Sequence, residues 1–422
     1  MAIDLTTIPA AIKTLYSPSV IREQTQKDHP IYAMLRKRTD LVGSPFNSFL
    51  VYGDASSGSA NFTNAAANTG APANSVFSLT ASQQYAIPTI DNKTMELTKN
   101  DKGAFVQALK FAMDGALREA AMGIALSIVG DGSGGRGTVK SVNTGANQLT
   151  LTDVNQTTNF NKGAILTAGY PSSGNWALRA STMTLTGIDR TTGVLTFSGG
   201  LVAALAAGDV LARQGDMTSG SPWNNGAGTT AGGTFAGLAG FLPLSRPVPG
   251  AGDSFAGLDR SADAWRLAGG FYNGTGGKSA MEVLNGAVAV SRREGGKPDY
   301  FFCNETYFNQ IQNDIQGKVE FETVEAFNEP QIGFDTIVIR SGAQKIRVMA
   351  DNSLPSNVGY LLQLDTWTLW SAGGPAVRIL SYPNYGQAYI PSSTADALQV
   401  RVGGYPLLEC TAPGFNVAVQ LK

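Results

Sequence analysis

The sequence predicts an α+β fold, and three observations support this prediction. Residues 46–99 contain two extended runs rich in β-branched and aromatic side chains, which favours a long β-hairpin. Residues 100–130 carry apolar side chains at helical spacing, which predicts one long helix. Residues 136–216 contain short alternating strands separated by turn residues, which predicts a small β-barrel.

The composition limits the class of protein. The chain has 422 residues, enough for two or three domains. Its formal net charge is −1, so the chain as a whole is not a basic binder of nucleic acid or of acidic membranes. Charged residues make up 15% of the chain, and glycine occurs 50 times. Low charge favours a surface that becomes interface, although a glycine-rich β protein with ordinary loops has the same composition.

The cysteines and the apolar segments indicate where the protein is made. Cys303 and Cys410 lie far apart and form no CxxC motif, so we expect two buried thiols in a reducing compartment. The N-terminus has no basic region before an apolar stretch and is not a secretion signal. The most apolar run, residues 120–130, is too short to span a bilayer. We therefore expect a soluble protein made in the cytoplasm.

Residues 1–45 are typical of an arm. Apolar side chains in residues 31–35 have helical spacing after Pro30, which predicts a short helix. Because this helix is too short to fold alone, we expect the arm to need a partner surface. The basic run Arg36, Lys37, Arg38 is interpreted as a solvated helical face, with nucleic acid or a neighbouring chain as the alternative contact.

The hairpin and the long helix follow the arm. Residues 55–75 between the two strands are small and polar, and an isolated hairpin is marginally stable in water, so we expect it to lie on another surface. The helix is expected to be capped by Asn100 or Asp101 and stopped by Gly130. Its apolar spacing is carried by Phe105, Leu109, Ala112, Ala116 and Leu117.

The run Gly277-Lys278-Ser279 matches the end of a phosphate-binding loop. That loop needs a glycine where this chain has Tyr272 and a strand before it, whereas residues 261–272 have a helical pattern. Ser279 and Glu282 instead form the S-x-x-E pattern of a capping box. The sequence therefore predicts a helix N-terminus here and no nucleotide site.

Gly130, Gly132 and Gly135 match the dinucleotide-binding pattern GxGxxG. In a dinucleotide site this pattern follows a strand and opens a helix. Here it closes the long helix, so we interpret it as a loop and predict no bound cofactor.

The remaining candidate chemistry is sparse. His29 is the single histidine, which excludes a metal site of several histidines, and we expect it at a surface or an interface. Glu320 and Glu322 share one strand face and could serve a hydrolase or a calcium site, but a solvated or subunit-facing edge is the favoured interpretation. No catalytic, cofactor-binding or metal-binding residue is predicted. Acidic and basic edges could pair across subunits, the basic residues being Arg340, Lys345 and Arg347.

The order of these elements resembles the major capsid protein of tailed bacteriophages, the Hong Kong 97-type fold. That family has an N-arm, an extended hairpin called the E-loop, a long spine helix in a peripheral domain, and an axial domain. The segment "PDYFFCNETYFNQIQ" (298–312) looks like the strand and helix of its axial domain, as does "IRVMADNSLPSNVGYLLQLDTWTLW" (346–370). The resemblance covers nearly the whole chain and depends on the order of elements.

The resemblance implies a division of the chain into segments. The small barrel is not part of the minimal fold and is expected as an insertion, because glycine-rich sequence flanks it on both sides. The expected segments are the N-arm (1–45), the E-loop hairpin (46–99), the peripheral domain with the spine helix (100–135), the inserted β-barrel (136–216), a glycine-rich peripheral connection (217–257), the axial domain (258–375) and returning peripheral strands (376–422).

The resemblance also implies the function. Copies of the chain are expected to form hexamers and pentamers of an icosahedral head that encloses double-stranded DNA. A separate scaffolding protein is expected, because no long helical segment precedes the arm. Proteolytic removal of a leading segment is not expected. A portal and a decoration protein are further expected partners, with weak non-specific contact between the inner face and DNA and no contact with membranes. The expected location is the virion, after assembly in the host cytoplasm.

Two other functions remain open from the sequence. The chain could be another virion component, such as a tail or decoration protein. It could also be a hydrolase that uses Glu320 and Glu322. The capsid interpretation depends on one physical expectation: the arm and the hairpin cannot bury their apolar groups within one subunit, so they lie across neighbouring copies.

Overall fold

The computed structural model describes most of the chain. The described residues are 28–43, 45–55, 58–91, 102–172, 175–218, 233–250, 252–315, 320–326, 329–341, 344–380, 389–391 and 396–421. The described side chains form three main apolar cores: one around the long helix, one in a seven-stranded sheet and one inside a ring of strands.

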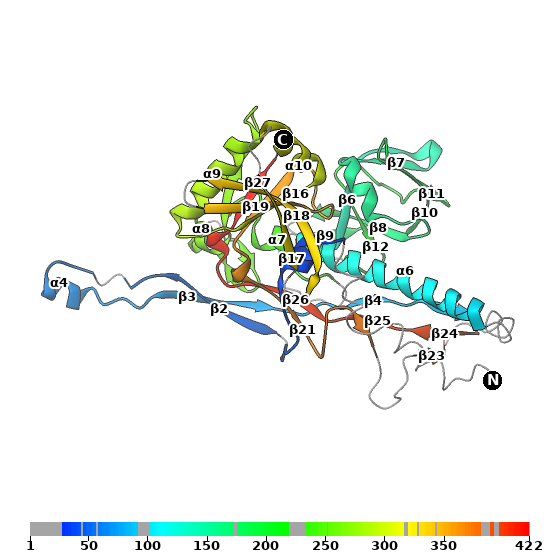
Figure 1. The fold of residues 1–422 in the computed structure, drawn as a ribbon, viewed down its shortest axis with the longest axis horizontal. Helices are drawn as coiled ribbons and strands as arrows, with labels where there is room; N and C mark the ends of the chain where they lie inside the picture. Colours follow the sequence, from blue (N-terminus) through cyan, green and yellow to red (C-terminus); the bar gives the residue numbers. More distant parts are fainter. Residues whose placement is uncertain are drawn as a thin grey trace.

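A long antiparallel hairpin projects from the body of the molecule (Figure 1). It consists of β2 (Phe46–Gly53) and β3 (Ala73–Leu79), and the short helix α4 (Phe62–Ala67) lies at its tip. Near the body, Leu50, Phe77 and Leu79 are buried in the main core. The hairpin is therefore anchored at its base.

The chain after β3 leaves the hairpin. Strand β4 (Gln84–Ala86) pairs with β25 (Val402–Gly404), and β5 (Thr89–Asp91) pairs with β24 (Ala397–Val400). The extended pattern over residues 46–99, predicted as one hairpin, therefore covers two structures: the hairpin β2–β3, and the strands β4 and β5 of two small sheets. The two small sheets are completed by β22 (Arg378–Ile379) and β23 (Tyr389–Pro391).

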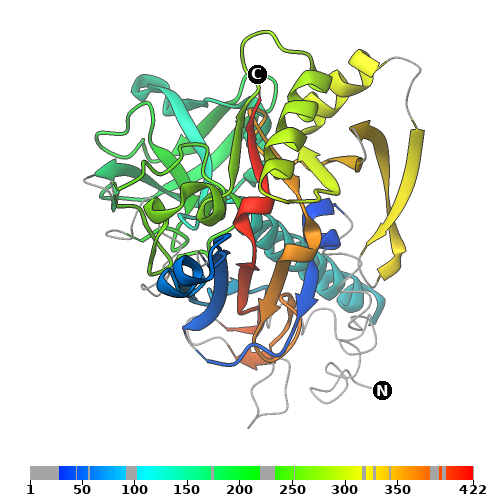
Figure 2. The same cartoon turned by 90° about the vertical axis from the view of Figure 1, so that its left-hand side faces the viewer.

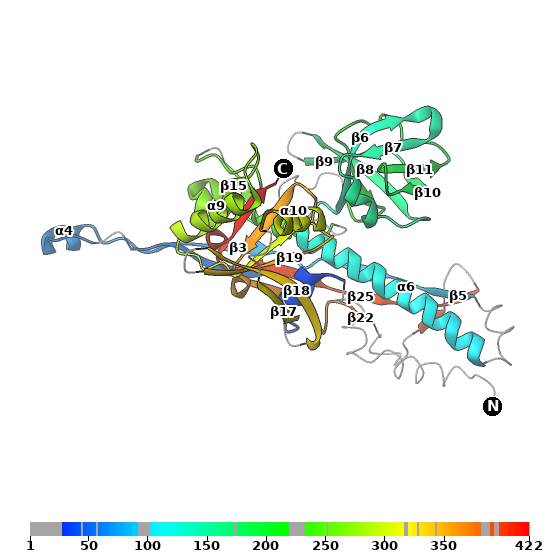
Figure 3. The same ribbon diagram turned by 45° about the horizontal axis from the view of Figure 1, so that its top comes forward.

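The long predicted helix is confirmed as α6 (Lys102–Val129), which extends away from the body (Figure 3). Its 28 residues span about 42 Å at 1.5 Å per residue. The predicted caps Asn100 and Asp101 lie outside the described residues, as do the side chains of Phe105 and Leu109. The buried face of the helix includes Met113, Leu117, Ile124 and Ile128.

The end of the arm packs on its own subunit. The predicted short helix is confirmed as α3 (Pro30–Met34), and its side chains are buried. The basic run is not a helical face but strand β1 (Arg36–Arg38), which pairs in parallel with β21 (Trp367–Ser371). The expectation that the arm needs a partner surface is wrong for α3 and β1, because α3 is buried in its own subunit and β1 pairs with the distant strand β21. Residues 1–27 lie outside the described residues.

A ring of strands forms a separate lobe beside α6 (Figure 3). The hydrogen-bonded pairs close on themselves because β8 contacts both β12 and β10. Leu149, Leu166, Leu185 and Leu211 fill the interior. The strands, in the order of their pairing, are β6 (Gly135–Asn143), β7 (Gln148–Leu151), β11 (Val194–Ser198), β10 (Met183–Asp189), β8 (Ile165–Ser172) and β12 (Val210–Arg213), with β9 (Asn175–Leu178) flanking β8.

The chain enters and leaves this ring at one place. Gly134 has a φ of +79°, and a Cβ atom there would collide with the backbone of Asp216. A glycine is therefore required where the two connections pass each other. The two ends of the ring lie side by side at the C-terminal end of α6.

A seven-stranded sheet forms the other lobe, and its strand β27 lies between the ring and helix α9 (Figure 2). Helices α9 (Ala280–Arg293) and α10 (Glu305–Ile315) contact each other and the sheet. The strands, in spatial order, are β15 (Gly270–Asn273), β27 (Val417–Gln420), β20 (Val358–Leu362), β16 (Tyr300–Cys303), β19 (Gln344–Ala350), β18 (Glu329–Ser341) and β17 (Glu320–Ala326).

The predicted helix over residues 261–272 is wrong. Only α8 (Ala264–Leu267) is helical, and its N-terminus is capped by the Asp263 side chain. Gly269, with a φ of +75°, ends it, and β15 follows. The pairing of β15 with β27, which is distant in sequence, overrides the local helical pattern.

The remaining elements are short. They are α7 (Leu238–Phe241), β26 (Pro406–Cys410), β13 (Ser254–Phe255), β14 (Leu258–Asp259) and the 3-10 turns η1 (Thr144–Ala146), η2 (Val154–Asn159), η3 (Arg260–Ala262), η4 (Leu364–Thr366) and η5 (Pro413–Phe415).

Candidate assembly surfaces and the charged junction

The outer face of the hairpin is apolar and exposed. Phe49 is 62% exposed and Val51 is 57% exposed, whereas Leu50 between them is 3% exposed. The register places Val76 directly opposite Phe49 on the same face. At the tip, Phe62 is 87% exposed. Phe49, Val51 and Val76 thus form an exposed apolar strip near the base of the hairpin, and Phe62 is a separate exposed apolar side chain at its tip. Exposed apolar groups of this kind are typical of a contact surface.

A cluster of charged side chains joins α6 to the ring. Glu119 of α6 accepts a hydrogen bond from Arg213 Nη1 of β12 at 2.8 Å. Arg213 Nε donates to Asp216 Oδ2 at 2.7 Å, and its Nη2 donates to Gln84 of β4 at 3.2 Å. These contacts connect the long helix, the ring and the small sheet that contains β4. We call Glu119, Arg136, Arg213 and Asp216 the charged junction.

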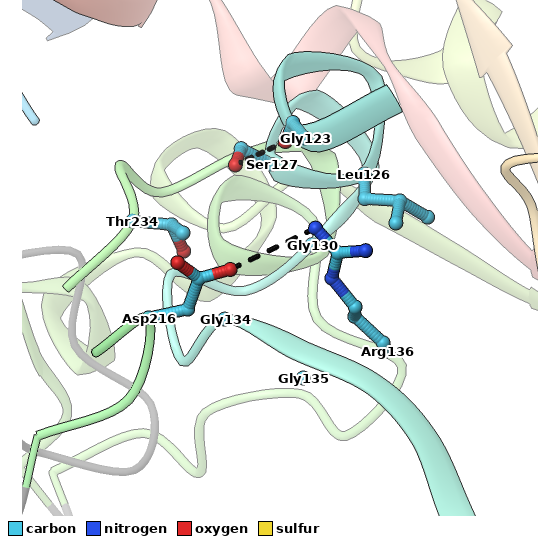
Figure 4. Close-up of a pocket in the computed structure, with 9 residues that line it drawn as sticks. All are labelled: Gly123, Leu126, Ser127, Gly130, Gly134, Gly135, Arg136, Asp216 and Thr234. Carbon is cyan, nitrogen blue, oxygen red and sulfur yellow. Dashed lines mark hydrogen bonds and ion pairs between the residues drawn. The ribbon is translucent and has the colours of Figure 1, made fainter. Parts of the chain in front are cut away.

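Arg136 is the buried member of this junction (Figure 4). Its side chain is 4% exposed, and its guanidinium group lies 3.5 Å from Glu119 and 3.8 Å from Asp216. Its Nη1 donates to the carbonyl of Asn159 at 3.0 Å. Burial, and then the charge of Arg213, lower the pKa of Arg136 to about 10, so it remains protonated at neutral pH. The site therefore holds two cations and two anions with little contact with water.

A second set of contacts joins the ring to the seven-stranded lobe. Asp153 of the ring accepts a hydrogen bond from the backbone amide of Ser356 at 2.7 Å. Asn155 Nδ2 donates to Thr306 Oγ1 of α10 at 3.3 Å. The ring is thus attached at two separated places, to α6 and to the loop and helix of the other lobe, which restrains its orientation.

The predicted helix N-terminus at Ser279 is confirmed. The Ser279 hydroxyl accepts from the Glu282 amide at 3.3 Å, and Glu282 Oε2 accepts from the Ser279 amide at 2.9 Å. Lys278 Nζ turns back and donates to the carbonyl of Asn273 at 2.7 Å. A strand, β15, does precede the loop, contrary to the sequence interpretation. The glycine required at position 272 is still replaced by a tyrosine.

The glycines after α6 form a crossing, as the sequence predicts. The amide of Gly237 donates to the carbonyl of Gly130 at 3.0 Å, and a Cβ atom on Gly237 would collide with the last carbonyls of α6. The pattern closes a helix and precedes strand β6, which is the reverse of a dinucleotide site.

The acidic and basic residues of the candidate hydrolase site lie on one sheet. Glu320 is opposite Val338 and Glu322 is opposite Thr336, on the edge strand β17. Arg340 is opposite Lys345, and Val338 is opposite Arg347. The register therefore places the acidic and the basic residues on the same face of one sheet, within one subunit. The side chains of Glu320 and Glu322 are not among those that the structure describes. Among the described residues, no group of three or more His, Cys, Asp or Glu side chains is placed to hold a metal ion.

The single histidine lies where the arm meets the body. His29 Nδ1 is 3.2 Å from the Ser353 hydroxyl, and Asp351 accepts a hydrogen bond from the Ile31 amide at 3.0 Å. The histidine is half-buried in the subunit, and its predicted place at a surface or an interface stays a prediction. Burial lowers the pKa of His29 from its ordinary value of 6.5, while the charges of Asp351 and Asp28 act in the opposite direction.

Acidification is expected to loosen the end of the arm. Because the pKa of His29 is lower in the folded chain, the neutral imidazole is the stabilised form. The contribution of neutral His29 to the stability of the folded arm is complete above pH 6.5. It is lost as the pH falls through the lower pKa that His29 has in the folded chain. Hydrogen exchange of residues 30–35 should therefore speed up from pH 7.5 to 5.5, after correction for the intrinsic rate. A His29→Gln variant should lose this pH dependence, and an unchanged profile would contradict the assignment.

The two cysteines are buried and unpaired, as predicted. Burial raises the pKa of both thiols well above the ordinary value, so neither is a reactive thiolate at neutral pH. Among the described residues, no helix is both long and apolar enough to span a lipid bilayer.

The chain is similar over most of its length to solved shell structures. The capsid asymmetric unit of Cyanophage A-1(L) is 11% identical, with a TM-score of 0.48, and the match covers 93% of this chain and 92% of that chain. The capsid of an empty GTA particle is 11% identical, with a TM-score of 0.42 and coverage of 94% and 90%. The holo-SrpI encapsulin complex from Synechococcus elongatus is 7% identical, with a TM-score of 0.42 and coverage of 94% and 88%.

Two of these structures are capsids, the kind of protein that the order of elements in the sequence resembles. No family model and no curated protein matches the chain.

Proposed function

We propose that this chain is a major capsid protein of the Hong Kong 97 type, which self-assembles into hexamers and pentamers of an icosahedral bacteriophage head around double-stranded DNA. The observation that carries this proposal is the hairpin β2–β3. Phe49 and Val51 near its base are more than half exposed, the hairpin itself extends beyond the body, and Phe62 is almost fully exposed at its tip. Burying this strip against a neighbouring copy removes apolar area from water.

The other elements fit the same role. The long helix α6, the small sheets of β22–β25–β4 and β23–β24–β5, and the seven-stranded lobe occur in the order expected for a peripheral and an axial domain. On this basis we keep, as a proposal, the division of the chain that the sequence predicted: the N-arm, the E-loop, the peripheral domain and the axial domain. We place the boundary of the E-loop near Leu79, because β4 and β5 pair with the small sheets instead.

The ring is proposed as an inserted β-barrel domain that stabilises its own subunit. Two observations support this role. Its two ends meet beside Gly134 and Asp216, so removing it leaves a short gap in the chain. Its contacts with α6 and with residues 306 and 356 lie within the same subunit. A domain held in this way restrains the angle between the long helix and the seven-stranded lobe.

The proposed partners follow from the shell. Copies of the chain contact one another in capsomers, and many weak contacts then act together. A separate scaffolding protein, a portal and a decoration protein complete the head, which assembles in the host cytoplasm and becomes part of the virion. The inner face contacts packaged DNA weakly, as expected from a net charge of −1. No chemistry is assigned to Glu320 and Glu322.

The particle mass and shape of the purified protein test the proposal. Electron microscopy and mass photometry of the full chain, alone and with crowding agents that promote assembly, should show closed shells or capsomers of five and six copies. Fibres or discs would favour a tail component instead. A stable monomer at high concentration, with the hairpin folded onto its own body, would overturn the capsid function.

A further inference from the structure

Two of the described arginines hold an aspartate through the same edge of the guanidinium group, the edge formed by Nε and Nη2. Arg179 donates through Nε and Nη2 to the two oxygens of Asp209, at 2.9 and 2.8 Å. Arg213 donates through the same two atoms to Asp216, at 2.7 and 3.3 Å. This paired donation matches the planar fork of the guanidinium to a carboxylate and is the strongest form of the contact.

Arg246 has the same edge without a carboxylate. Its Nε and Nη2 atoms are shielded from water and have no hydrogen-bond partner among the residues that the structure describes. Buried donors are almost always paired in folded proteins, so two unpaired donors on one edge call for an acceptor from elsewhere. The edge that is empty on Arg246 is the edge that Arg179 and Arg213 use to hold an aspartate.

The side chain of Arg246 is already held in place. Its guanidinium carbon lies 3.3 Å from the ring centre of Trp265, and that of Arg293 lies 4.0 Å from the same centre. Two guanidinium groups this close cannot share one face, so they flank the indole. Stacking fixes the plane of Arg246, and its fork edge remains without a carboxylate although protein atoms cover it.

The local charge also lacks one anion. Arg266 lies 3.8 Å from Asp263 and 3.7 Å from Glu294, and Arg293 lies 3.3 Å from Glu294. The two acids of this cluster thus engage the other two arginines. Burial, and then the charge of Arg293, lower the pKa of Arg246, while the charges of Glu294 and Asp263 act in the opposite direction.

The loop around Arg246 has the properties of a contact surface. Pro243, Pro247 and Pro249 restrict its backbone, and Val248 is 65% exposed. Arg246 also lines a cavity of about 720 Å³ between the ring and the body. Because the fork edge is shielded, docking requires a small shift of side chains in this exposed loop.

We propose that Arg246 is an assembly contact whose fork edge receives a carboxylate from a second copy of this chain. The proposal rests on the proposed function of shell assembly and adds to it a specific receptor residue. Charge complementarity supports this occupant: the cluster has three arginines and two acids, and in the proposed capsomers the neighbours of a subunit are copies of the same chain. Exposed Val248 is covered in the same contact.

Sedimentation velocity of the full chain tests the contact. Arg246→Gln should reduce the assembled fraction at least tenfold at a concentration where the natural chain is half assembled. Arg246→Lys should lie between the two, because an ammonium group carries the charge without the fork. The subunit itself should stay folded, with a melting temperature lowered only by the loss of the Arg246–Trp265 stacking, because no internal hydrogen bond is lost. Arg190→Gln, on an exposed turn of the ring, is the matched control and should assemble normally.

The amine introduced by Arg246→Lys allows the occupant to be identified. Mixed particles of ¹⁴N- and ¹⁵N-labelled Arg246→Lys chains, treated with a carbodiimide, should yield an isopeptide between one labelled and one unlabelled chain. A cross-link within one chain, or none at this position, would overturn the proposal. So would normal assembly of Arg246→Gln. If the natural chain forms no particles under any condition, the proposed function fails first, and the two failures are distinguishable.

Discussion

Shortening the hairpin is expected to abolish closed shells and leave a folded subunit. Gly53 and Ala73 face each other in the β2–β3 register, so an Asn-Gly turn can replace residues 54–72 without changing the strand pairing. The replaced segment includes Phe62, which is 87% exposed, and the buried base formed by Leu50 and Phe77 is kept. Electron microscopy should show no closed particles, while circular dichroism and the melting temperature remain close to those of the natural chain.

Point substitutions separate the role of the strip from that of the length. Phe49→Ser with Val51→Thr removes apolar area from the exposed face and should weaken assembly at least tenfold without lowering the subunit's melting temperature. Leu50→Ser, on the opposite face, is the control: it buries an unpaired hydroxyl in the core and should destabilise the subunit itself. Normal shells from the shortened hairpin would mean that other surfaces carry the assembly.

The long helix and the strands of the hairpin could be predicted because their signals are local. Helical spacing and a glycine stop define α6 to within two residues of the expected ends. The capping box of Ser279 and Glu282 is likewise a four-residue pattern and forms as expected. These features depend on neighbours in sequence, which a single chain displays directly.

The docking of the arm could not be predicted, because its partners lie far away in the chain. The amide of Ile31 binds Asp351, which is 320 residues distant, and β1 pairs with β21. The run Arg36, Lys37, Arg38 suggested a solvated helical face; Arg36 and Arg38 are indeed exposed, but the run is a strand. Arg38 lies 4.9 Å from the ring centre of Trp370, and Lys37 Nζ donates to the Ala33 carbonyl. Lys37 and Arg38 thus contact groups of their own subunit.

The charged junction and Arg246 were also missed. Glu119, Arg136 and Arg213 come from the helix, the start of the ring and its end, and the one local hint is the i,i+3 pair of Arg213 with Asp216. The strands of the ring were visible as alternating runs, but closure depends on the pairing of β8 with β10 across the lobe. Such pairings follow from packing and have no short-range signature.

Removing the carboxylate of Glu119 is expected to have the larger effect on stability than removing Arg136. Glu119 lies 2.8 Å from Arg213 and 3.5 Å from Arg136, so Glu119→Gln leaves two cations with one remaining acid, Asp216. Breaking a buried pair costs about 3–5 kcal/mol, and the 28% exposure of Glu119 reduces this to about 3 kcal/mol. Arg136→Met removes a cation that already lacks a partner for Nη2, so we expect a loss of about 1–2 kcal/mol from the Asn159 hydrogen bond.

The double variant decides whether the junction acts as one unit. If Glu119 mainly neutralises Arg136, then Glu119→Gln with Arg136→Met should be more stable than Glu119→Gln alone, because the stranded cation is gone. Hydrogen exchange of the β6 and β12 amides in the full chain measures the stability of this region alone. The midpoint of global unfolding would instead average over all three apolar cores. Additive losses would show that Glu119 holds the ring to α6 through Arg213, independently of Arg136. A partial recovery of stability in the double variant would mean that buried Arg136 lowers the stability of the subunit while it fixes the angle between the ring and the long helix.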